Sequence, residues 1–238
     1  RPLVSILATG DELVPAGQAL EGGQIYDINS FSIAASVAAC GGVPRHLGIA
    51  RDNLEDLESK LRAVAGSDLV ITSAGVSRGD YDMVKDVLTS WGNMNFWSVR
   101  MRPAKPLAFG HLRAEGEKEV PLLGLPGNPV SAMVAFEMFA RPAIRAMLGR
   151  RPSPRPAVEG VLAGPIYNED GRRVYARVQV EARNGTYYAT PTGPQGSNIL
   201  TSMSRANGLA ICPENLPSKQ SGDRVRIIML DWNEEVFV

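Results

Sequence analysis

Hydrophobic residues follow two different spacings over the first 149 residues. Compact apolar runs are typical of buried strands, and apolar residues three or four positions apart are typical of amphipathic helices. The expected strands cover residues 3–8, 43–50, 68–73, 96–100, 106–109 and 122–125. The expected helices cover residues 29–39, 54–64 and 83–91, followed by a longer helix after Asn128. This alternation predicts an α/β domain over residues 1–149, with an open, mostly parallel sheet and helices on both faces.

Polar residues mark the starts of two of these helices. Asn29 is a candidate N-cap for the first helix, and either Asp52 or Asn53 for the second. Their side-chain oxygens can accept a hydrogen bond from a free N–H group of the first helical turn. Gly41 and Gly42 are expected to end the first helix, because glycine tolerates the left-handed conformation that follows many helices.

The pattern changes after residue 149. Residues 149–158 read GRRPSPRPAV, and the prolines predict a stiff linker, which we place at residues 150–155. Short alternating strands are expected beyond it, at residues 174–180, 187–190, 208–212 and 224–230. Residues 156–238 are therefore expected to form a small all-β barrel domain, with a sandwich as the alternative.

Composition limits the possible partners and compartments. Basic and acidic residues are equal at 25 each, so we expect neither nucleic acid nor a membrane as a partner. No apolar run approaches the ~20 residues of a membrane span, and the first residues show no leader pattern. The two cysteines stand far apart and only two histidines are present, which argues against a zinc site, a disulfide framework or a histidine-based triad. We expect a cytoplasmic protein.

Three unusual loops follow strands of the α/β domain: residues 9–12 (TGDE), 73–82 (SAGVSRGDYD) and 124–131 (GLPGNPVS). Ligands of open α/β sheets bind beyond the carboxyl ends of the strands. Loops of small residues that enter helices present free backbone N–H groups, which bind phosphate. Any one loop has a tight turn as its alternative, but three at one edge favour an anion site. None of them matches the P-loop or the dinucleotide-binding fingerprint.

Carboxylates gather at the same edge, namely Asp11, Glu12, Asp52, Asp80 and Asp82. These acids would repel a phosphate unless a cation stood between them, and Mg²⁺ is the usual one. Helix capping is the alternative for Asp52 and Asp82.

A basic segment, VRMRPAKP at residues 99–106, follows the fourth expected strand. Its Arg100, Arg102 and Lys105 could bind an oxyanion, with an exposed strand edge as the alternative.

The order and spacing of these motifs resemble the MoeA family of molybdopterin molybdenumtransferases, which includes the catalytic domain of gephyrin. The resemblance rests on ATGDEL (8–13), GGQIYDINS (22–30), GIARD (48–52), TSAGVSRGDYD (72–82), MRPAKPLAFG (101–110), GLPGNPVSA (124–132) and QGSNILTSMSRANGLAICPE (195–214). It implies an enzyme that binds adenylylated molybdopterin, cleaves its pyrophosphate bond with Mg²⁺ to release AMP, and inserts molybdate. It also implies a homodimer, with the molybdopterin adenylyltransferase as a partner. Family members carry two further domains ahead of this region.

The resemblance assigns roles to individual residues. The acids implied in metal binding and catalysis are Glu12, Asp52 and Asp82, and the basic residues implied in catalysis are Arg102 and Lys105. The residues implied in holding the nucleotide or pterin phosphate are Thr9, Gly10, Ser73, Gly75, Ser77, Gly79 and Asp80. The residues implied in the wall of the pterin pocket are Pro126, Gly127, Asn128, Pro129 and Ser131. Arg177 and Ser197 match positions that the family uses near molybdate.

The chain departs from the family pattern at three positions of these motifs. Ala74 and Ala104 stand where the family has glycine, and Arg102 stands where it has lysine. Two other functions are therefore considered. A molybdopterin adenylyltransferase consists of the α/β domain alone, so the second domain argues against it. A non-catalytic, gephyrin-like scaffold is the other alternative.

Overall fold

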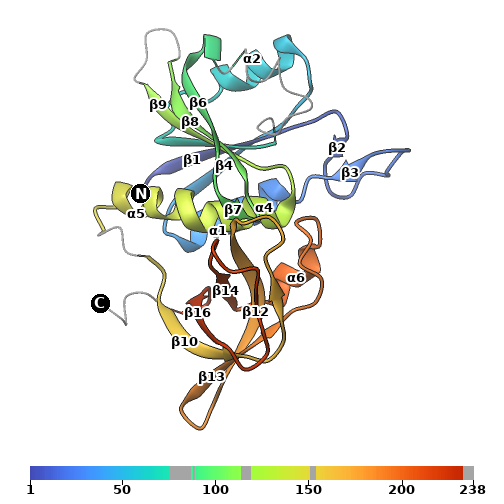
Figure 1. Ribbon diagram of the computed structural model, residues 1–238. Helices are drawn as coiled ribbons and strands as arrows, with labels where there is room; N and C mark the ends of the chain where they lie inside the picture. Colours follow the sequence, from blue (N-terminus) through green and yellow to red (C-terminus); the bar gives the residue numbers. More distant parts are fainter. Residues whose placement is uncertain (75–86, 88, 114–118, 151–153, 233–238) are drawn as a thin grey trace. The chain divides into compact units, whose positions relative to one another are not determined.

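The computed structural model describes residues 1–74, 87, 89–113, 119–150 and 154–232, which form two compact units (Figure 1). The first unit comprises Arg1–Val99 and Ala104–Pro152, and the second comprises Arg100–Pro103 and Ser153–Val238. The domain boundaries expected from the sequence, 1–149 and 156–238, place the whole basic segment in the first domain. Four residues of the basic segment belong to the second unit.

The first unit is built on a six-stranded sheet in the order β4-β1-β5-β9-β8-β6. Its strands are β1 (Leu3–Thr9), β4 (Val43–Ala50), β5 (Leu69–Ser73), β6 (Gly92–Ser98), β8 (Pro106–Leu112) and β9 (Val120–Leu125). The strands β4, β1, β5 and β9 are parallel, whereas β8 runs antiparallel to both of its neighbours, β9 and β6. The expected open, mostly parallel sheet is confirmed.

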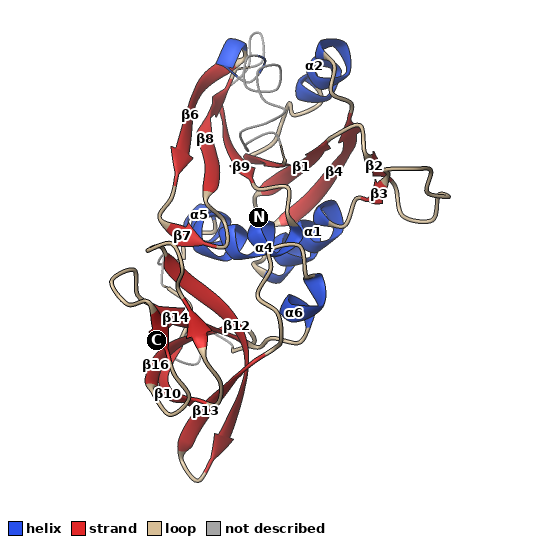
Figure 2. Ribbon diagram, turned by 45° about the vertical axis from the view of Figure 1, so that its right-hand side comes forward, coloured by secondary structure: helices blue, strands red, loops and turns tan. Residues whose placement is uncertain are grey.

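Helices cover both faces of this sheet (Figure 2). On one side lie α1 (Asn29–Ala39), α4 (Pro129–Ala135) and α5 (Arg141–Met147), and on the other lies α2 (Leu54–Arg62). α2 buries Leu57 and Leu61 in a core cluster that includes Leu7, Val70 and Leu122 from the sheet. Most of the helix expected at residues 83–91 lies outside the described residues.

The single long helix expected after Asn128 is wrong in one detail. A π-helical turn, Phe136–Ala140, separates α4 from α5, and the N–H of Arg141 donates to the carbonyl of Phe136. Pro142 explains the local change, because it has no N–H to complete the ordinary α-helical ladder.

The two expected helix caps have different outcomes. Asn53 caps α2, because its side chain accepts from the N–H of Asp56 at 2.9 Å, so the alternative cap Asp52 is not used. Asn29 does not cap α1. The side chain of Asp27 accepts from the N–H of Ser30 at 3.0 Å instead, while Asn29 lies within the first turn and donates to the carbonyl of Gly127 at 2.7 Å. An earlier acid thus took the capping role.

The second unit contains a closed five-stranded barrel. Its strands are β10 (Ala157–Leu162), β12 (Arg173–Arg183), β13 (Thr186–Pro191), β14 (Gly208–Cys212) and β16 (Arg224–Met229). The strand order is β13-β10-β16-β14-β12, and β12 also pairs with β13, which closes the ring. The barrel is therefore confirmed over the sandwich. β10 was not predicted from the sequence. The short strand β7 (Met101–Arg102) pairs with β12 and is not part of the closed ring.

Small, branched side chains fill the barrel, including Ala176, Val178, Ala210 and Ile227. Each of these four is fully buried. Within the residues that the structure describes, no helix has the length and apolarity that crossing a bilayer would require.

Candidate functional site

The four parallel strands of the first unit end at one edge of the sheet. Thr9 at the end of β1 pairs with Ala50 of β4, and Ser73 at the end of β5 pairs with Leu125 of β9. The loops that follow these strands therefore start side by side. They carry most of the residues that the sequence assigned to the site in this unit: Thr9, Gly10, Glu12, Asp52, Ser73, Pro126, Gly127, Asn128, Pro129 and Ser131. Gly75, Ser77, Gly79, Asp80 and Asp82 lie outside the described residues.

Two acids of this edge are joined by reciprocal hydrogen bonds, from the backbone N–H of each to the carboxylate of the other. The N–H of Asp52 donates to the carboxylate of Asp11 at 3.1 Å, and the N–H of Asp11 donates to the carboxylate of Asp52 at 3.3 Å. Arg51 fastens the same loop, since its guanidinium donates to the carbonyl of Asp11 at 3.0 Å. The loops after β1 and β4 are thus held together, with both carboxylates exposed at the edge.

Gly10 makes room for the Glu12 carboxylate. Its φ is +143°, and a Cβ placed at Gly10 would lie 2.5 Å from the nearer carboxylate oxygen of Glu12. No side chain fits at that distance, so any other residue at position 10 would displace the acid. The absence of a side chain at Gly10 therefore leaves the space that the Glu12 carboxylate occupies.

Buried hydroxyl groups lie where β5 reaches the edge. Ser73 is 1% exposed, and neither its hydroxyl nor that of Thr72 has a hydrogen-bond partner among the described residues. Unsatisfied buried hydroxyls are rare in native proteins and commonly mark a site that a ligand or water completes. A phosphate oxygen is one acceptor that could complete the Ser73 hydroxyl.

The loop after β9 packs closely on the end of β5. The N–H of Ala74 donates to the carbonyl of Leu125 at 3.1 Å, and a Cβ on Gly127 would lie 3.2 Å from the Cβ of Ala74. Asn29 of α1 fixes the same loop through the carbonyl of Gly127. α4 then begins at Pro129, and Ser131 in its first turn is 5% exposed.

Ala74 and Ala104 keep the backbone conformation that glycine would have. Their φ values are 80° and 73°, which L-residues with a Cβ adopt only at a cost. Both alanines therefore hold a strained conformation that glycine would adopt freely.

The donor set at this edge suits magnesium. Glu12, Asp52 and the adjacent Asp11 offer only carboxylate oxygens, which are the ligands that Mg²⁺ prefers. Among the described residues, no group of three acidic, histidine or cysteine side chains comes close enough to hold a metal. The third acid of the expected set, Asp82, is not among them.

Arg177, expected near molybdate, is a buried strand residue of the barrel. It is 1% exposed and donates to the hydroxyl of Ser202 at 3.1 Å and to the carbonyl of Gly196 at 3.0 Å. Gln195 bonds its backbone on both sides, accepting from the N–H and donating to the carbonyl. Arg177 thus anchors the loop that carries the half-buried Ser197.

Burial, as the larger cause, and the positive charge of Arg102 together lower the pKa of Arg177 to about 10. Arg102 belongs to the barrel unit through β7 and pairs with the carboxylate of Glu169 at 3.3 Å. Arg102 therefore belongs to the barrel unit, although the sequence placed it in the domain of residues 1–149. Lys105 belongs to the α/β unit, where it is exposed.

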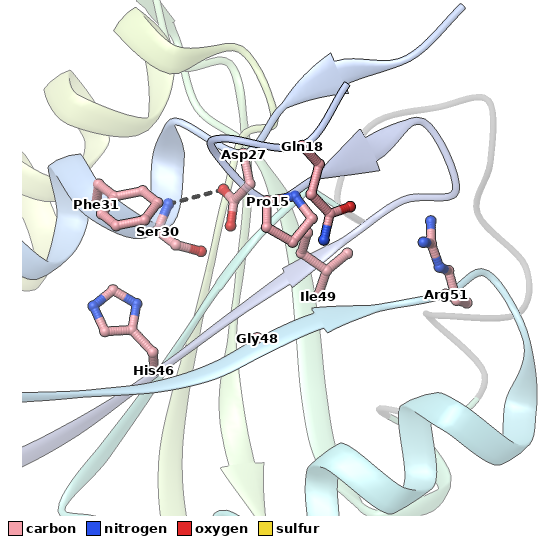
Figure 3. A pocket seen from close by; sticks show the side chains of 9 residues that line it. All are labelled: Pro15, Gln18, Asp27, Ser30, Phe31, His46, Gly48, Ile49 and Arg51. Atoms are coloured by element: carbon pink, nitrogen blue, oxygen red, sulfur yellow. Dashed lines mark hydrogen bonds between the residues drawn. The ribbon is translucent and has the colours of Figure 1, made fainter. Parts of the chain in front are cut away.

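A cavity of about 410 Å³ lies beside the start of α1 (Figure 3). Its lining includes Asp27, Ser30, Phe31, His46 and Arg51. None of these residues was expected to be a site residue. Three of them nevertheless lie in motifs that carry the family resemblance: Asp27 and Ser30 in GGQIYDINS, and Arg51 in GIARD. The motifs therefore contained the information, but an acid and a serine at the start of a helix are more often capping residues.

Comparison with known proteins agrees with this architecture. The family model described as a probable molybdopterin binding domain matches residues 5–146, and that of the MoeA C-terminal region (domain IV) matches residues 159–230. The first unit thus matches the family described as a probable molybdopterin binding domain, and the second is a barrel of the MoeA C-terminal type. The chain belongs to the MoeA family.

Individual relatives cover almost all of this chain. It is 37% identical to a molybdopterin molybdenumtransferase of Nostoc sp. over 97% of its length, and 34% identical to molybdopterin molybdenumtransferase 2 of Mycobacterium tuberculosis over 95%. The crystal structure of the molybdopterin biosynthesis moea protein from Pyrococcus horikosii superposes with a TM-score of 0.81 at 29% identity over 98% of this chain. The chain spans about half of each, namely 53%, 56% and 55% of their lengths.

Proposed function

We propose that this chain inserts molybdate into adenylylated molybdopterin, with Mg²⁺-dependent release of AMP. The proposal rests on one observation above all. Several polar groups lie at the carboxyl edge of the sheet, in a domain that matches the model of a probable molybdopterin binding domain. They are the reciprocally bonded Asp11 and Asp52, the Glu12 carboxylate and the buried Ser73 hydroxyl. Acids that are held rigidly beside free polar groups suit a cation that bridges to phosphate.

The residues of this edge divide the work. Glu12 and Asp52, together with Asp82, would hold Mg²⁺, which when bound neutralises phosphate charge. Thr9 and Ser73, with Gly75, Ser77, Gly79 and Asp80, would hold the phosphates through hydroxyls and backbone N–H groups. Gly10 would lie beside them, with its own N–H donating to the carbonyl of Ala50 at 3.1 Å. The loop of residues 126–131 would form the wall of the pterin pocket. A rigid arrangement favours catalysis, because the protein need not reorganise as charge develops.

Molybdate would be bound by basic residues of the second unit. Arg102 and Arg177 belong to that unit, and the positive charge of Arg102 contributes to the lowered pKa of Arg177. A guanidinium whose charged form is disfavoured by a second guanidinium is a favourable place for an oxyanion, which relieves the repulsion. Ser197, on the loop that Arg177 anchors, would add a hydroxyl.

The family resemblance alone supports three further proposals. They are a homodimer, transfer of substrate from the adenylyltransferase, and a cytoplasmic location.

Isothermal titration calorimetry with adenylylated molybdopterin, AMP and ATP separates the candidate functions. The proposed enzyme binds adenylylated molybdopterin and AMP. An adenylyltransferase would also bind ATP and turn it over with molybdopterin, and a scaffold without a working pocket would bind none of the three. Titration with Mg²⁺ chelated should weaken binding of the adenylylated pterin, because the acids at the edge would then repel its phosphates.

A further inference from the structure

A β-bulge in β4 decides on which face of the sheet Arg51 lies. Leu47 has no partner on β1, because the residues on either side of it pair with the consecutive Ile6 and Leu7. In a regular strand Arg51 would share the face of Leu47, since side chains alternate between the two faces. With the bulge, Leu47 and Ala50 both pack in the core, and Arg51 lies on the opposite face, at the end of β4 (Figure 3). Bulges often redirect side chains beside functional sites.

The side chain of Arg51 holds the main chain on both sides of Glu12. One guanidinium nitrogen, Nη1, donates to the carbonyl of Asp11 at 3.0 Å and to that of Leu13 at 3.3 Å. Between them, the carbonyl of Glu12 accepts from the N–H of Ile25 in β3 (Ile25–Tyr26) at 2.8 Å. Three consecutive carbonyls are therefore bonded, and two of them depend on Arg51.

The main chain of Arg51 is anchored at the start of α2. Its N–H donates to the carboxylate of Asp56 at 2.7 Å, and its carbonyl accepts from the N–H of Asn53 at 2.7 Å. Asp52 thus stands between two anchored residues, and it also exchanges hydrogen bonds with Asp11. A single residue therefore connects α2 with both of the loops that carry proposed Mg²⁺ ligands.

Arg51 stabilises these loops and leaves their carboxylates available. Among the described residues, its guanidinium bonds carbonyl groups and forms no ion pair with a carboxylate. A guanidinium bonded to the carboxylates would compete with a cation for their oxygens. One that bonds the adjoining carbonyls fixes the acids without that competition.

We propose that Arg51 is a positioning residue, which holds Glu12 and Asp52 in the arrangement in which both ligate Mg²⁺. The inference rests on the function proposed above and adds the residue that sets the geometry of its cation site. Arg51 does not itself contact the cation, because like charges repel. Hydrogen-bonding groups around metal ligands orient those ligands, and their removal typically weakens metal binding by roughly 10- to 100-fold.

Charge and position have opposite effects on cation affinity at Arg51. Removing a positive charge beside the site would strengthen cation binding, because a repulsion disappears. Removing the bonds to the carbonyls of Asp11 and Leu13 would weaken it, because the two acids lose their fixed arrangement. Arg51→Met removes both the charge and the bonds, so the direction of the change distinguishes a positioning residue from a merely charged one.

Titration of the whole chain with Mn²⁺, followed by electron paramagnetic resonance of the free ion, measures this affinity without turnover. Mn²⁺ takes the same carboxylate and water ligands as Mg²⁺. We expect a site that Glu12→Gln and Asp52→Asn each weaken. Arg51→Met should bind Mn²⁺ ~10-fold more weakly than the unmodified chain. Arg51→Lys should recover affinity to within ~3-fold, because its ammonium keeps the charge and a donor nitrogen.

Two variants are matched controls. Arg1→Met removes a guanidinium that likewise bonds two carbonyls, those of Gly41 and Gly42 at 2.8 and 2.9 Å, before the starts of β1 and β4. Asp68→Asn changes an acid that accepts from the N–H of Leu3 at 2.8 Å, at the start of β1. Both lie at the opposite end of these strands from the carboxyl edge, and both should bind Mn²⁺ as the unmodified chain does.

Melting temperatures show whether the variants fold. Should Arg51→Met fail to fold, Arg51→Gln makes the same test, because it also removes the charge and its shorter side chain cannot reach both carbonyls. We expect weaker Mn²⁺ binding in this variant too, whereas a role of charge alone predicts stronger binding.

Several outcomes would overturn the proposal. They are unchanged or stronger Mn²⁺ binding in Arg51→Met, an equal loss in Arg1→Met, and the absence of Mn²⁺ binding by the unmodified chain. Failure of the broader function gives a different result. A chain that binds Mn²⁺ through Glu12 and Asp52, and more weakly in Arg51→Met, but releases no AMP from adenylylated molybdopterin would contradict the insertion activity and leave the role of Arg51 standing. Release of AMP by Arg51→Met at an unchanged Mg²⁺ requirement would contradict the role of Arg51 alone.

Discussion

At the scale of single residues, two alanines of the first unit carry backbone strain. Ala74 and Ala104 have φ values of 80° and 73°, and both occupy positions at which the family pattern has glycine. The left-handed conformation costs an L-residue roughly 1–2 kcal/mol, whereas glycine adopts it freely. The sequence identified both departures, but it could not show whether the backbone had moved to relieve the strain or had kept its course.

Replacing these alanines with glycine should therefore stabilise the fold. The relief of strain is opposed by the greater conformational entropy of glycine in the unfolded chain, and we expect a net gain of up to about 1 kcal/mol for Ala74→Gly or Ala104→Gly. Urea denaturation measures the change. Ala132→Gly in the middle of α4 is the control and should destabilise by about 1 kcal/mol. A loss of stability in the first two variants would contradict the assigned backbone angles.

At the scale of secondary structure elements, Arg45 connects three parts of the first unit. Its guanidinium on β4 donates to the hydroxyls of Ser5 on β1 and Ser67 before β5, and to the carbonyls of Ala63 and Ala65 after α2. The two serine hydroxyls also bond each other at 2.8 Å. This network fixes the turn between α2 and β5, and with it the start of the central strands.

Removal of Arg45 should cost considerably more stability than removal of a surface arginine. Arg45→Ala leaves buried hydroxyls and carbonyls without their donor, and we expect a loss of about 2–4 kcal/mol in the free energy of unfolding. Arg62→Ala is the control, because Arg62 is 73% exposed and its ion pair with Glu58 is long, at 3.8 Å. That change should cost no more than ~0.5 kcal/mol. Similar losses in both variants would show that the Arg45 network is not formed.

The sequence predicted which elements exist better than it predicted their details. Buried strands such as β5 and the periodic α2 followed from apolar spacing, because burial on the sheet dictates that spacing. The cap of α1, the π turn before α5 and the bulge in β4 did not follow. Each depends on a hydrogen bond or a pairing register that several neighbouring residues could have supplied. The cavity beside α1 was missed for a related reason, because its lining combines residues from separate parts of the chain.

At the scale of the whole molecule, the chain enters its second unit twice. Residues Arg100–Pro103 belong to the barrel unit, with β7 pairing on β12, before the chain returns to the first unit at Ala104. Sequence spacing cannot reveal a pairing between positions about 70 residues apart, so the basic segment was assigned to the first domain alone. The carboxyl edge was predictable, since parallel strands necessarily end together. The burial of Arg177 was not.

Arg177 should therefore affect both the barrel and molybdate. Arg177→Lys keeps a positive charge but cannot make both bonds, to Ser202 and Gly196, in the same geometry. We expect a loss of about 1–3 kcal/mol in barrel stability and a higher half-saturating molybdate concentration for cofactor formation, with binding of the pterin nucleotide unchanged. Arg183→Lys, at an exposed pair with Glu181, is the control. Destabilisation with unchanged molybdate dependence would make Arg177 a purely structural residue.

The most direct test of the central claim is the release of AMP from adenylylated molybdopterin by the purified chain, followed by chromatography with and without Mg²⁺ and molybdate. The account predicts release that requires Mg²⁺ and is lost, by ~100-fold or more, in Glu12→Gln and Asp52→Asn, while Asp68→Asn retains the activity of the unmodified chain. Unfolding curves of the variants should match that of the unmodified chain, because the acids are exposed. Full, Mg²⁺-dependent release by both acid variants would contradict the assignment of the carboxyl edge as the catalytic site.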